Sequence, residues 1–247
     1  MKKGIKIALC CAAALAVLGG GLALCVYHGV LLLNHPSRSR YPVRGVDVSH
    51  YQGEIDWPVL ASQQIDFAFI KATEGSGYQD SRFATNWAGA RASGLRAGAY
   101  HFFSFDSPGA TQAENFCATV PKEADALPPV VDVEFYGDKA ENPPARADVA
   151  RELTAMLDAL EAHYGQKPIL YATEESYALF LAGDFADYDI WIRNVFTRPS
   201  LSDGRAWTFW QYTNRARLEG YEGEERFIDL NVFCGTREEF ERYGAAA

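Results

Sequence analysis

The chain has 247 residues, of which 48% are hydrophobic and 22% are charged, and its formal net charge is −9. This composition excludes a disulfide-stabilised mini-protein, a collagen-like chain and a disordered tail. The charge is uneven: residues 1–40 carry five basic residues and no acid, whereas residues 41–247 carry 18 Lys and Arg against 32 Asp and Glu, or −14. An acidic body argues against nucleic-acid binding, so no nucleic-acid partner is expected.

The amino-terminal segment, residues 1–33, predicts a membrane-associated helix. Its first six residues include three lysines, and residues 7–27 contain no charged residue. About 20 such residues can span a bilayer, whereas the apolar core of a cleaved signal peptide has about 7–15. Run length therefore favours a retained anchor, contacting the membrane through residues 5–33, although Ala14-Leu15-Ala16 is compatible with signal cleavage. The lysines predict a cytoplasmic amino terminus and an extracytoplasmic body, which is secreted if the segment is cleaved.

The rest of the chain predicts one domain behind a short connection. Residues 34–42 are polar and contain two prolines, which indicates a linker, and residues 43–247 follow without a repeat or a low-complexity stretch. Three of the five cysteines lie in the apolar segment, which leaves Cys117 and Cys234 in the body. Two cysteines of an exported protein can form a disulfide, but their spacing does not show whether these two meet.

Short apolar stretches alternate with helical ones through residues 43–247. The expected strands are 44–48, 67–72, 97–103, 129–135, 168–172, 189–193, 208–212 and 227–230, and the expected helices are 81–93, 108–119, 146–164 and 174–182. Eight strands that alternate with helices predict an α/β fold, an irregular TIM-barrel-like barrel. A doubly wound open sheet is the alternative, but no Gly-rich phosphate-binding turn supports it.

Four acidic residues lie within these apolar strands, where desolvation makes a charge costly. Asp47 lies in the first strand, Asp132 and Glu134 in the fourth and Asp229 in the eighth. Active sites of β/α barrels lie at the carboxyl ends of the strands, so we expect the four to meet there. Residues i and i+2 of a strand face the same way, which makes Asp132 and Glu134 a pair able to divide into an acid and an ionised partner. The alternative is a structural pair, ion-paired with Lys71 or Arg193.

Aromatic residues near the strand ends provide a second signal, because flat amphipathic rings stack on sugars and still offer hydrogen bonds. Tyr100, Tyr171 and Trp191 are expected to line a sugar-binding groove, although core packing explains most such rings taken singly. His101 should point away from Tyr100, toward the helices. Lys71 ends the second strand, where it either orients the acids or forms an ion pair with Glu74. The expected substrate-binding set is Tyr100, Tyr171, Trp191, Gln211 and Lys71.

Eight segments taken together resemble glycoside hydrolase family 25, the Chalaropsis-type lysozymes, which are N-acetylmuramidases. The segments are Gly45–Trp57, Phe67–Gly75, Gly98–Phe102, Val131–Glu134, Pro168–Ala172, Ile190–Ile192, Phe209–Thr213 and Ile228–Asn231. Their order and spacing match over nearly all of residues 43–235. The resemblance implies an irregular β/α barrel that cleaves the β-1,4 bond between N-acetylmuramic acid and N-acetylglucosamine in peptidoglycan glycan strands.

The resemblance also implies roles for the four acids. By position, Glu134 is similar to the proton donor, Asp132 to its partner carboxylate, and Asp47 and Asp229 to the two other active-site acids. The step is either substrate-assisted, with Asp132 stabilising an oxazolinium ion, or a direct attack by Asp132. One departure concerns residues 191–195, which read Trp-Ile-Arg-Asn-Val where similar enzymes often read Trp-Ile-Ala-x-Tyr, and this puts groove contacts at that edge in doubt.

Two other functions are compatible with a barrel of this kind. A non-catalytic peptidoglycan-binding barrel is one, but it has no reason to retain four buried acids. A related glycosidase such as a chitinase is the other, but Pro128 and Val130 occupy positions where chitinase-type barrels carry further Asp residues. No metal, cofactor or obligate protein partner is expected, because no spacing resembles a zinc site or a calcium loop.

Overall fold

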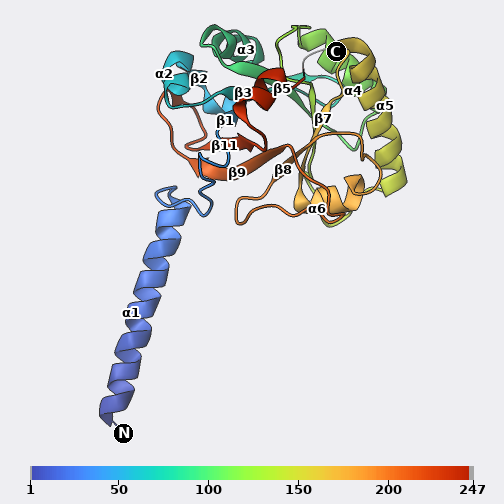
Figure 1. Ribbon diagram of the computed structural model, residues 1–247. Coiled ribbons are helices and arrows are strands. Elements are labelled where there is room, and N and C mark those ends of the chain that lie inside the picture. The colour runs from blue at the N-terminus through green and yellow to red at the C-terminus, as the bar shows by residue number, and fades with distance from the viewer. Residues whose placement is uncertain (1, 245–247) are drawn as a thin grey trace.

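Eight strands close into a barrel in the computed structural model, which describes residues 2–244 (Figure 1). The barrel strands are β1 (Arg44–Val48), β3 (Phe67–Glu74), β5 (Arg96–Phe102), β6 (Val130–Val133), β7 (Ile169–Thr173), β8 (Ile190–Arg193), β9 (Phe209–Ala216) and β11 (Ile228–Phe233). Each of the eight expected strands is present. The expectation of a closed eight-stranded barrel is confirmed, because β1 pairs with β3 on one side and with β11 on the other.

The last strand runs against the others. All pairings from β1 through β3 and on to β9 are parallel, whereas β11 is antiparallel to both of its neighbours, β9 and β1. The expectation that all four acids lie at carboxyl ends of strands is therefore wrong for Asp229, which is the second residue of β11. The antiparallel direction brings the amino end of β11 to the edge where the parallel strands end.

Helices cover the outside of the barrel (Figure 1). They are α2 (Trp57–Ser62), α3 (Phe83–Ala92), α4 (Gly109–Thr119), α5 (Arg146–Tyr164), α6 (Glu174–Ser176) and α7 (Arg237–Arg242), with a 3₁₀ turn η1 (His50–Gln52) and a π turn η2 (Tyr177–Leu181). The expected helix 174–182 is divided between α6 and η2. Gly165 ends α5 in the left-handed conformation, at φ 73°, which glycine adopts without steric cost. Short strands β2 (Glu54–Ile55) and β10 (Tyr221–Glu222) pair with each other, and β4 (Tyr78–Gln79) pairs antiparallel with the end of β3.

The apolar core has two layers, as the alternation of side chains along a strand requires. Val131 and Val133 of β6 face the helices, in the layer between the strands and α3, α4 and α5. The second layer fills the barrel interior and is largely aromatic. Its members include Phe67, Phe69, Val130, Tyr171, Trp191 and Phe209. Phe240 of α7 joins this interior layer and closes the end of the barrel where the parallel strands begin.

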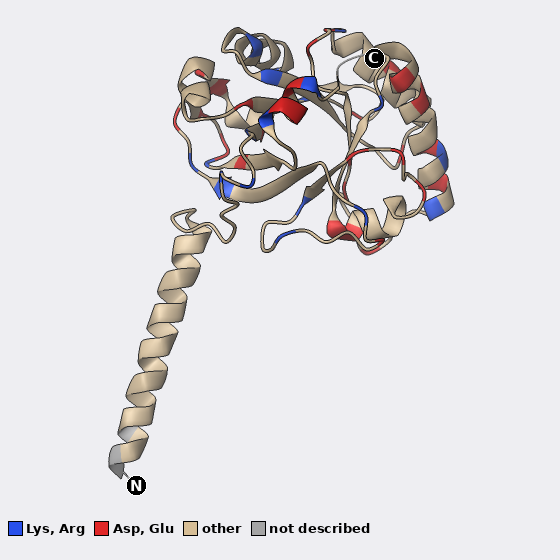
Figure 2. Cartoon of the chain, viewed as in Figure 1, with Lys and Arg blue, Asp and Glu red and all other residues tan. Residues whose placement is uncertain are grey.

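A long helix, α1 (Lys2–Tyr27), projects from the barrel (Figure 1). Its segment Ile7–Tyr27 has a mean hydropathy of 2.4 and is not buried by the rest of the chain, so it is long and apolar enough to cross a membrane or to serve as a signal sequence. No Lys, Arg, Asp or Glu interrupts this stretch, whereas both signs of charge are spread over the barrel (Figure 2).

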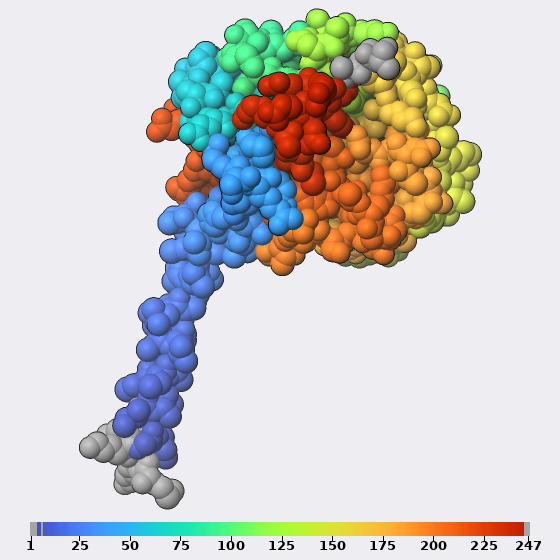
Figure 3. Space-filling model, viewed as in Figure 1, coloured from blue at the N-terminus to red at the C-terminus, as the bar shows by residue number. Residues whose placement is uncertain are grey.

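The residues that follow α1 pack onto the barrel (Figure 3). Asn34 is buried, and its side-chain amide donates to the carbonyls of Asn194 and Tyr212, at 3.2 and 3.1 Å. Tyr41 is buried against Trp207. The stretch expected to be a linker is therefore held in place over much of its length. Cys117 and Cys234 are both free thiols.

Candidate active site

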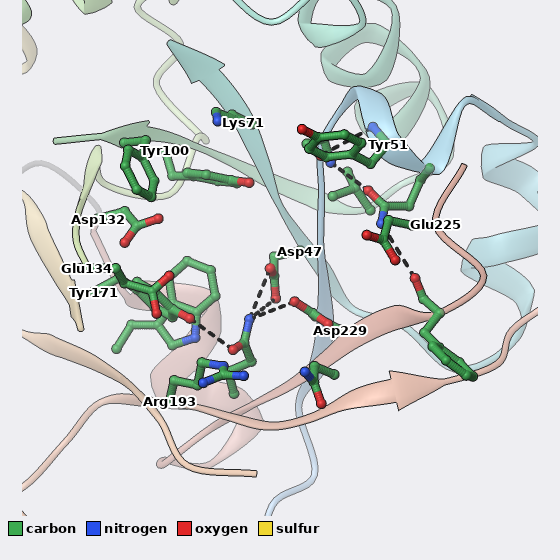
Figure 4. A pocket seen from close by; sticks show the side chains of 18 residues that line it. Asp47, Tyr51, Lys71, Tyr100, Asp132, Glu134, Tyr171, Arg193, Glu225 and Asp229 are labelled. Carbon is green, nitrogen blue, oxygen red and sulfur yellow. Dashed lines mark hydrogen bonds between the residues drawn. The ribbon is translucent and has the colours of Figure 1, made fainter. Parts of the chain in front are cut away.

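A pocket of about 490 Å³ opens at the edge of the barrel where the parallel strands end (Figure 4). Eighteen residues line it, and they include all nine residues that the sequence singles out for catalysis or substrate binding. The four acids among them are Asp47, Asp132, Glu134 and Asp229. The sequence-predicted residues are thus brought together in one cavity.

Asp132 and Glu134 reach the pocket from a single strand. Val133, between them, packs toward the helices, so the two carboxyl groups enter the cavity on the same face (Figure 4). The backbone of Asp132 is fixed by pairing with Phe102 and Tyr171 on the neighbouring strands. Its side chain is buried, and its Oδ1 has no hydrogen-bond partner among the described residues. An unpartnered carboxylate oxygen in a polar cavity is available to a bound molecule.

Burial raises the pKa of both members of this pair. The pKa of Glu134 rises to about 7, because the group is desolvated and because Asp47 is also negative, while Arg193 acts in the opposite direction. Desolvation also holds the pKa of Asp132 well above its usual range, and the charge of Glu134 adds to this effect. Lys71 acts in the opposite direction on Asp132. Two such groups together retain a proton near neutral pH.

Asp47 and Asp229 form a second pair, directly opposite each other on β1 and β11. The side-chain amide of Gln211 bridges them, with its Nε2 at 2.9 Å from Asp47 Oδ2 and 3.1 Å from Asp229 Oδ2. Asn231 Nδ2 donates to Asp47 Oδ2 at 2.7 Å. Burial raises the pKa of both acids. The negative charge of Asp47 raises the pKa of Asp229 further, whereas the hydrogen bonds from Asn231 and Gln211 lower the pKa of Asp47. Asp47 receives more of these amide hydrogen bonds than Asp229 does, so the surroundings favour the ionised form of Asp47 over that of Asp229.

The three aromatic residues expected in a groove form the wall and floor of the pocket. Trp191 is 2% exposed, stacks on Phe69 at 4.4 Å between ring centroids, and donates from Nε1 to Asn231 at 2.8 Å. The Tyr171 hydroxyl donates to Gln211 Oε1 at 2.9 Å. Tyr100 packs edge-on against Trp191 and is partly exposed. Trp191 and Tyr171 are thus buried and held by hydrogen bonds, and Tyr100 has the more accessible ring.

Lys71 and His101 show how strand alternation separates the pocket from the core. Lys71 lines the pocket and forms an ion pair with Glu74 at 2.7 Å, so it is not ion-paired with Asp132. His101 faces the helices, where its ring bonds to Thr73 Oγ1 at 2.7 Å and to Gln112 Oε1 at 2.9 Å. Burial lowers the pKa of His101 to about 4, which keeps the ring neutral. Its expected orientation is confirmed.

Among the residues that the sequence did not single out for catalysis or binding, two act directly on the acids of the site. Asn231 is fully buried and holds both Asp47 and Trp191 in place. Its position two residues after Asp229 on the same strand face is the signal that could have found it. Arg193 ends β8 and lines the pocket close enough to act on the pKa of Glu134. The sequence indicated Arg193 as a possible structural ion-pair partner of the acids and as a departure from the family pattern, but not as a residue of the site.

Comparison with known proteins places this site in a family. The model of "Glycosyl hydrolases family 25" matches residues 46–221. Among curated proteins, the chain is 36% identical to the uncharacterized protein YegX of Escherichia coli K12, over 82% of this chain and 74% of that protein. It is 32% identical to lysozyme M1 of Streptomyces globisporus, over 78% of this chain and 68% of that one.

Solved structures agree with the sequence comparison. A family 25 glycosyl hydrolase from Bacillus anthracis superposes with a TM-score of 0.82 at 58% identity, covering 87% of this chain and 98% of that one. The fold, the order of the matched segments and the relatives are consistent with one another. The chain therefore belongs to glycoside hydrolase family 25 and is a glycoside hydrolase of the lysozyme, or muramidase, type.

Proposed function

We propose that this chain cleaves the β-1,4 bond between N-acetylmuramic acid and N-acetylglucosamine in peptidoglycan, with Glu134 as general acid and base and Asp132 as its partner. The observation that carries the proposal is the pair itself. The buried Asp132 of β6 and the half-buried Glu134 just after it both line the pocket, and the pKa of Glu134 is raised to about 7. A carboxyl group that retains its proton at neutral pH suits the role of acid in glycoside hydrolysis.

In the first step, the Glu134 carboxyl group donates its proton to the glycosidic oxygen while the bond from that oxygen to the anomeric carbon breaks. The partner carboxylate must be ionised at this moment, and Lys71 favours the charged form of Asp132. Asp132 either stabilises an oxazolinium ion formed by the sugar's own 2-acetamido oxygen or attacks the anomeric carbon directly. Water then attacks the same carbon and gives a proton to Glu134, which restores the acid.

The second pair supports the first without donating to the leaving group. Asp47 is held by Gln211 and Asn231, and these same two amides accept hydrogen bonds from Tyr171 and Trp191. This network fixes the pocket floor before substrate arrives, so little ordering remains at the moment of reaction. We assign Asp47 and Asp229 to substrate binding and positioning within the site.

The test is a digestion of purified peptidoglycan by the full chain in detergent, with the products identified by mass. A muramic-acid reducing end is expected, and a glucosamine reducing end would refute the proposed bond. Glu134→Gln should lower the rate by about 100-fold or more, since general acid–base catalysis contributes about 10²–10⁴-fold. Glu225→Gln is the matched control, because Glu225 is an exposed carboxyl group at the rim of the same pocket. Equal rates for Glu134→Gln and wild type would exclude Glu134 as the donor.

We further propose that α1 is retained as a membrane anchor with its amino terminus in the cytoplasm and the barrel outside. The support is the 21-residue apolar stretch Ile7–Tyr27, which is longer than a signal-peptide core, together with the lysines that precede it. Mass spectrometry of the mature protein and fractionation of cells test this topology. A soluble product that begins after residue 16 would show cleavage instead.

A further inference from the structure

The end of α1 and the mouth of the active site lie at the same end of the barrel. Arg215 near the carboxyl end of β9 donates to the carbonyl of Tyr27 at 2.6 Å, and Arg217 just beyond it donates to the carbonyl of His28. α7 closes the opposite end, where Phe240 packs on Phe67. In Figure 1, α1 leaves the barrel at its lower left, and α7, in dark red, lies in front of the barrel near the upper middle of the view.

The active-site pocket continues toward α1. Asn214, Glu225 and Phe227 line the active-site pocket, and they also line a second cavity whose far wall is Tyr27 and His28. Gly29 allows this close approach: its φ is +65°, and a Cβ there would lie 2.3 Å from the carbonyl oxygen of Arg215 and 2.8 Å from the Phe227 ring. No larger side chain fits between the helix end and the rim of the active site.

Four apolar side chains are exposed beside this junction, and we call them the apolar rim. They are Val30 (72% exposed), Leu31 (39%), Leu33 (50%) and Phe196 (71%). Phe196 lies in the loop after β8 and is the most exposed large hydrophobic residue of the described barrel. A groove of about 170 Å³ separates this loop from the residues that follow α1, and both Leu31 and Phe196 line it. Exposed apolar clusters of this kind mark contact surfaces.

The loop that carries Phe196 is held rigidly. The side-chain oxygen of Asn194 accepts from the backbone amides of Phe196 and Thr197 at 3.0 and 2.9 Å. Its carbonyl accepts from Asn34 and from Trp210, which ties the loop to the juxtamembrane residues and to β9. Phe196 directly follows residues 191–195, and these hydrogen bonds hold it as a fixed, exposed side chain beside the residues that follow α1.

We propose that the apolar rim rests on the outer surface of the bilayer that holds α1, so that the active site opens at the membrane and cleaves glycan attached close to it. The inference rests on the proposed muramidase activity and on retention of α1. A bilayer that covers the apolar stretch of α1 ends at about Tyr27, and interfacial aromatic and aliphatic side chains next to that point enter the headgroup region. The substrate class is membrane-attached glycan rather than strands deep in the wall.

The contact itself is tested with full-length protein in vesicles of phosphatidylethanolamine and phosphatidylglycerol whose acyl chains are brominated near the glycerol. All five native Trp residues are buried in the barrel, so Phe196→Trp adds an accessible indole. Brominated lipid should quench most of that added emission. Leu179→Trp is the matched control, because Leu179 is also exposed but follows α6, which lies at the lower right of Figure 1, away from α1 at the lower left. Equal quenching of the two, or none at position 196, would overturn the proposal.

The consequence for substrate choice is tested by inserting a flexible Gly/Ser spacer of about 20 residues between Tyr27 and His28, which extends the tether by about 25 Å. We expect a several-fold lower rate on a glycan polymer anchored by lipid in the same vesicles, with an unchanged rate on soluble glycan of equal length. An unchanged ratio of the two rates would contradict the inference while leaving the muramidase proposal intact. Loss of both activities in the wild-type chain would instead contradict the muramidase proposal.

Discussion

At the scale of single residues, burial suits Glu134 to act as an acid and also limits the pH range in which it can do so. Desolvation raises its pKa to about 7, so the carboxyl group is protonated below that pH and ionised above it. Arg193 opposes this effect, since it favours the ionised form. The proton donor therefore works near the upper limit of its useful range at neutral pH.

We accordingly predict that kcat/KM on soluble glycan falls as pH rises through about 7, because the free enzyme then loses the proton that it must donate. Substituting Arg193→Leu removes the neighbouring positive charge, which should raise the pKa of Glu134 and move this limb to higher pH. The measurement is a pH profile of kcat/KM for both proteins. An alkaline limb that does not move in the Arg193 variant would contradict the assignment of the limb to Glu134.

The raised pKa of Glu134 also predicts that replacing its carboxyl group by a neutral amide increases the free energy of unfolding. A raised pKa means that the contribution of Glu134 to stability is fully present below about pH 4.5 and is lost as pH rises through about 7. The loss is about 3 kcal/mol for a shift of this size. Glu134→Gln should therefore become more stable relative to wild type between about pH 5 and pH 8, by up to that amount. Urea unfolding at the two pH values measures it, and the exposed Glu225→Gln should show no such change.

Asn231 positions two other residues of the site, Asp47 and Trp191, through hydrogen bonds. Its amide donates to Asp47 and accepts from Trp191, and it is fully buried. Asn231→Ala should cost about 1–3 kcal/mol of unfolding free energy, because two buried polar groups lose their partner. Thermal and urea unfolding measure this cost. The exposed Asn142→Ala should change stability by less than about 0.5 kcal/mol.

At the scale of elements, the alternation of apolar residues predicted the strands of the barrel. It did not predict whether each strand runs parallel or antiparallel to its neighbours. A run such as residues 129–135 indicates a strand and assigns its faces, so the joint placement of Asp132 and Glu134 followed from alternation alone. The apolar pattern of residues 227–230 is equally compatible with a parallel and an antiparallel strand. Only the pairing with β1 and β9 determines that β11 is antiparallel, and such pairing depends on contacts between distant parts of the chain.

The short helix α7 was missed because six residues, Arg237–Arg242, are too few for a periodic pattern. A local signal was nevertheless present: Thr236 and Glu239 form a capping box, in which each side chain bonds the other's backbone amide. Its single buried residue, Phe240, packs on Phe67 and Phe233 inside the barrel. The position of α7 is therefore determined by the packing of Phe240 in the barrel rather than by a helical pattern in its own sequence.

Phe240→Ala should therefore destabilise the barrel by about 3–5 kcal/mol, the usual cost of removing a buried aromatic ring. The loss is structural, so the pH at which kcat/KM declines should stay the same in the folded variant. Glu241→Ala is the control on the same helix, because Glu241 is exposed. Unfolding curves for the two variants distinguish closure of the barrel from a general effect of altering the carboxyl terminus.

At the scale of the whole molecule, the distribution of charge conflicts with the charge of the proposed substrate. The body carries −14, and peptidoglycan is anionic, so long-range attraction cannot bring the two together. The proposed membrane anchor would remove that need, because it would hold the enzyme near its substrate. The basic first residues and the uncharged stretch after them predicted the helix, and the alternation of apolar strands with helices predicted the barrel. The docking of residues 28–42 was not predictable, because it depends on side chains of β9 and of the loop after β8.

The repulsion makes salt dependence a test of the whole-molecule view. Screening shortens the reach of charges from about 30 Å at 0.01 M salt to about 8 Å at 0.15 M. Detergent-solubilised chain should therefore digest suspended peptidoglycan faster at the higher salt, whereas its rate on a short glycan without carboxylates should stay flat. The same chain held by α1 beside lipid-anchored glycan should respond less than it does in suspension. A flat or falling rate on suspended peptidoglycan would show that the acidity of the body does not limit encounter, and the anchor would then need another explanation.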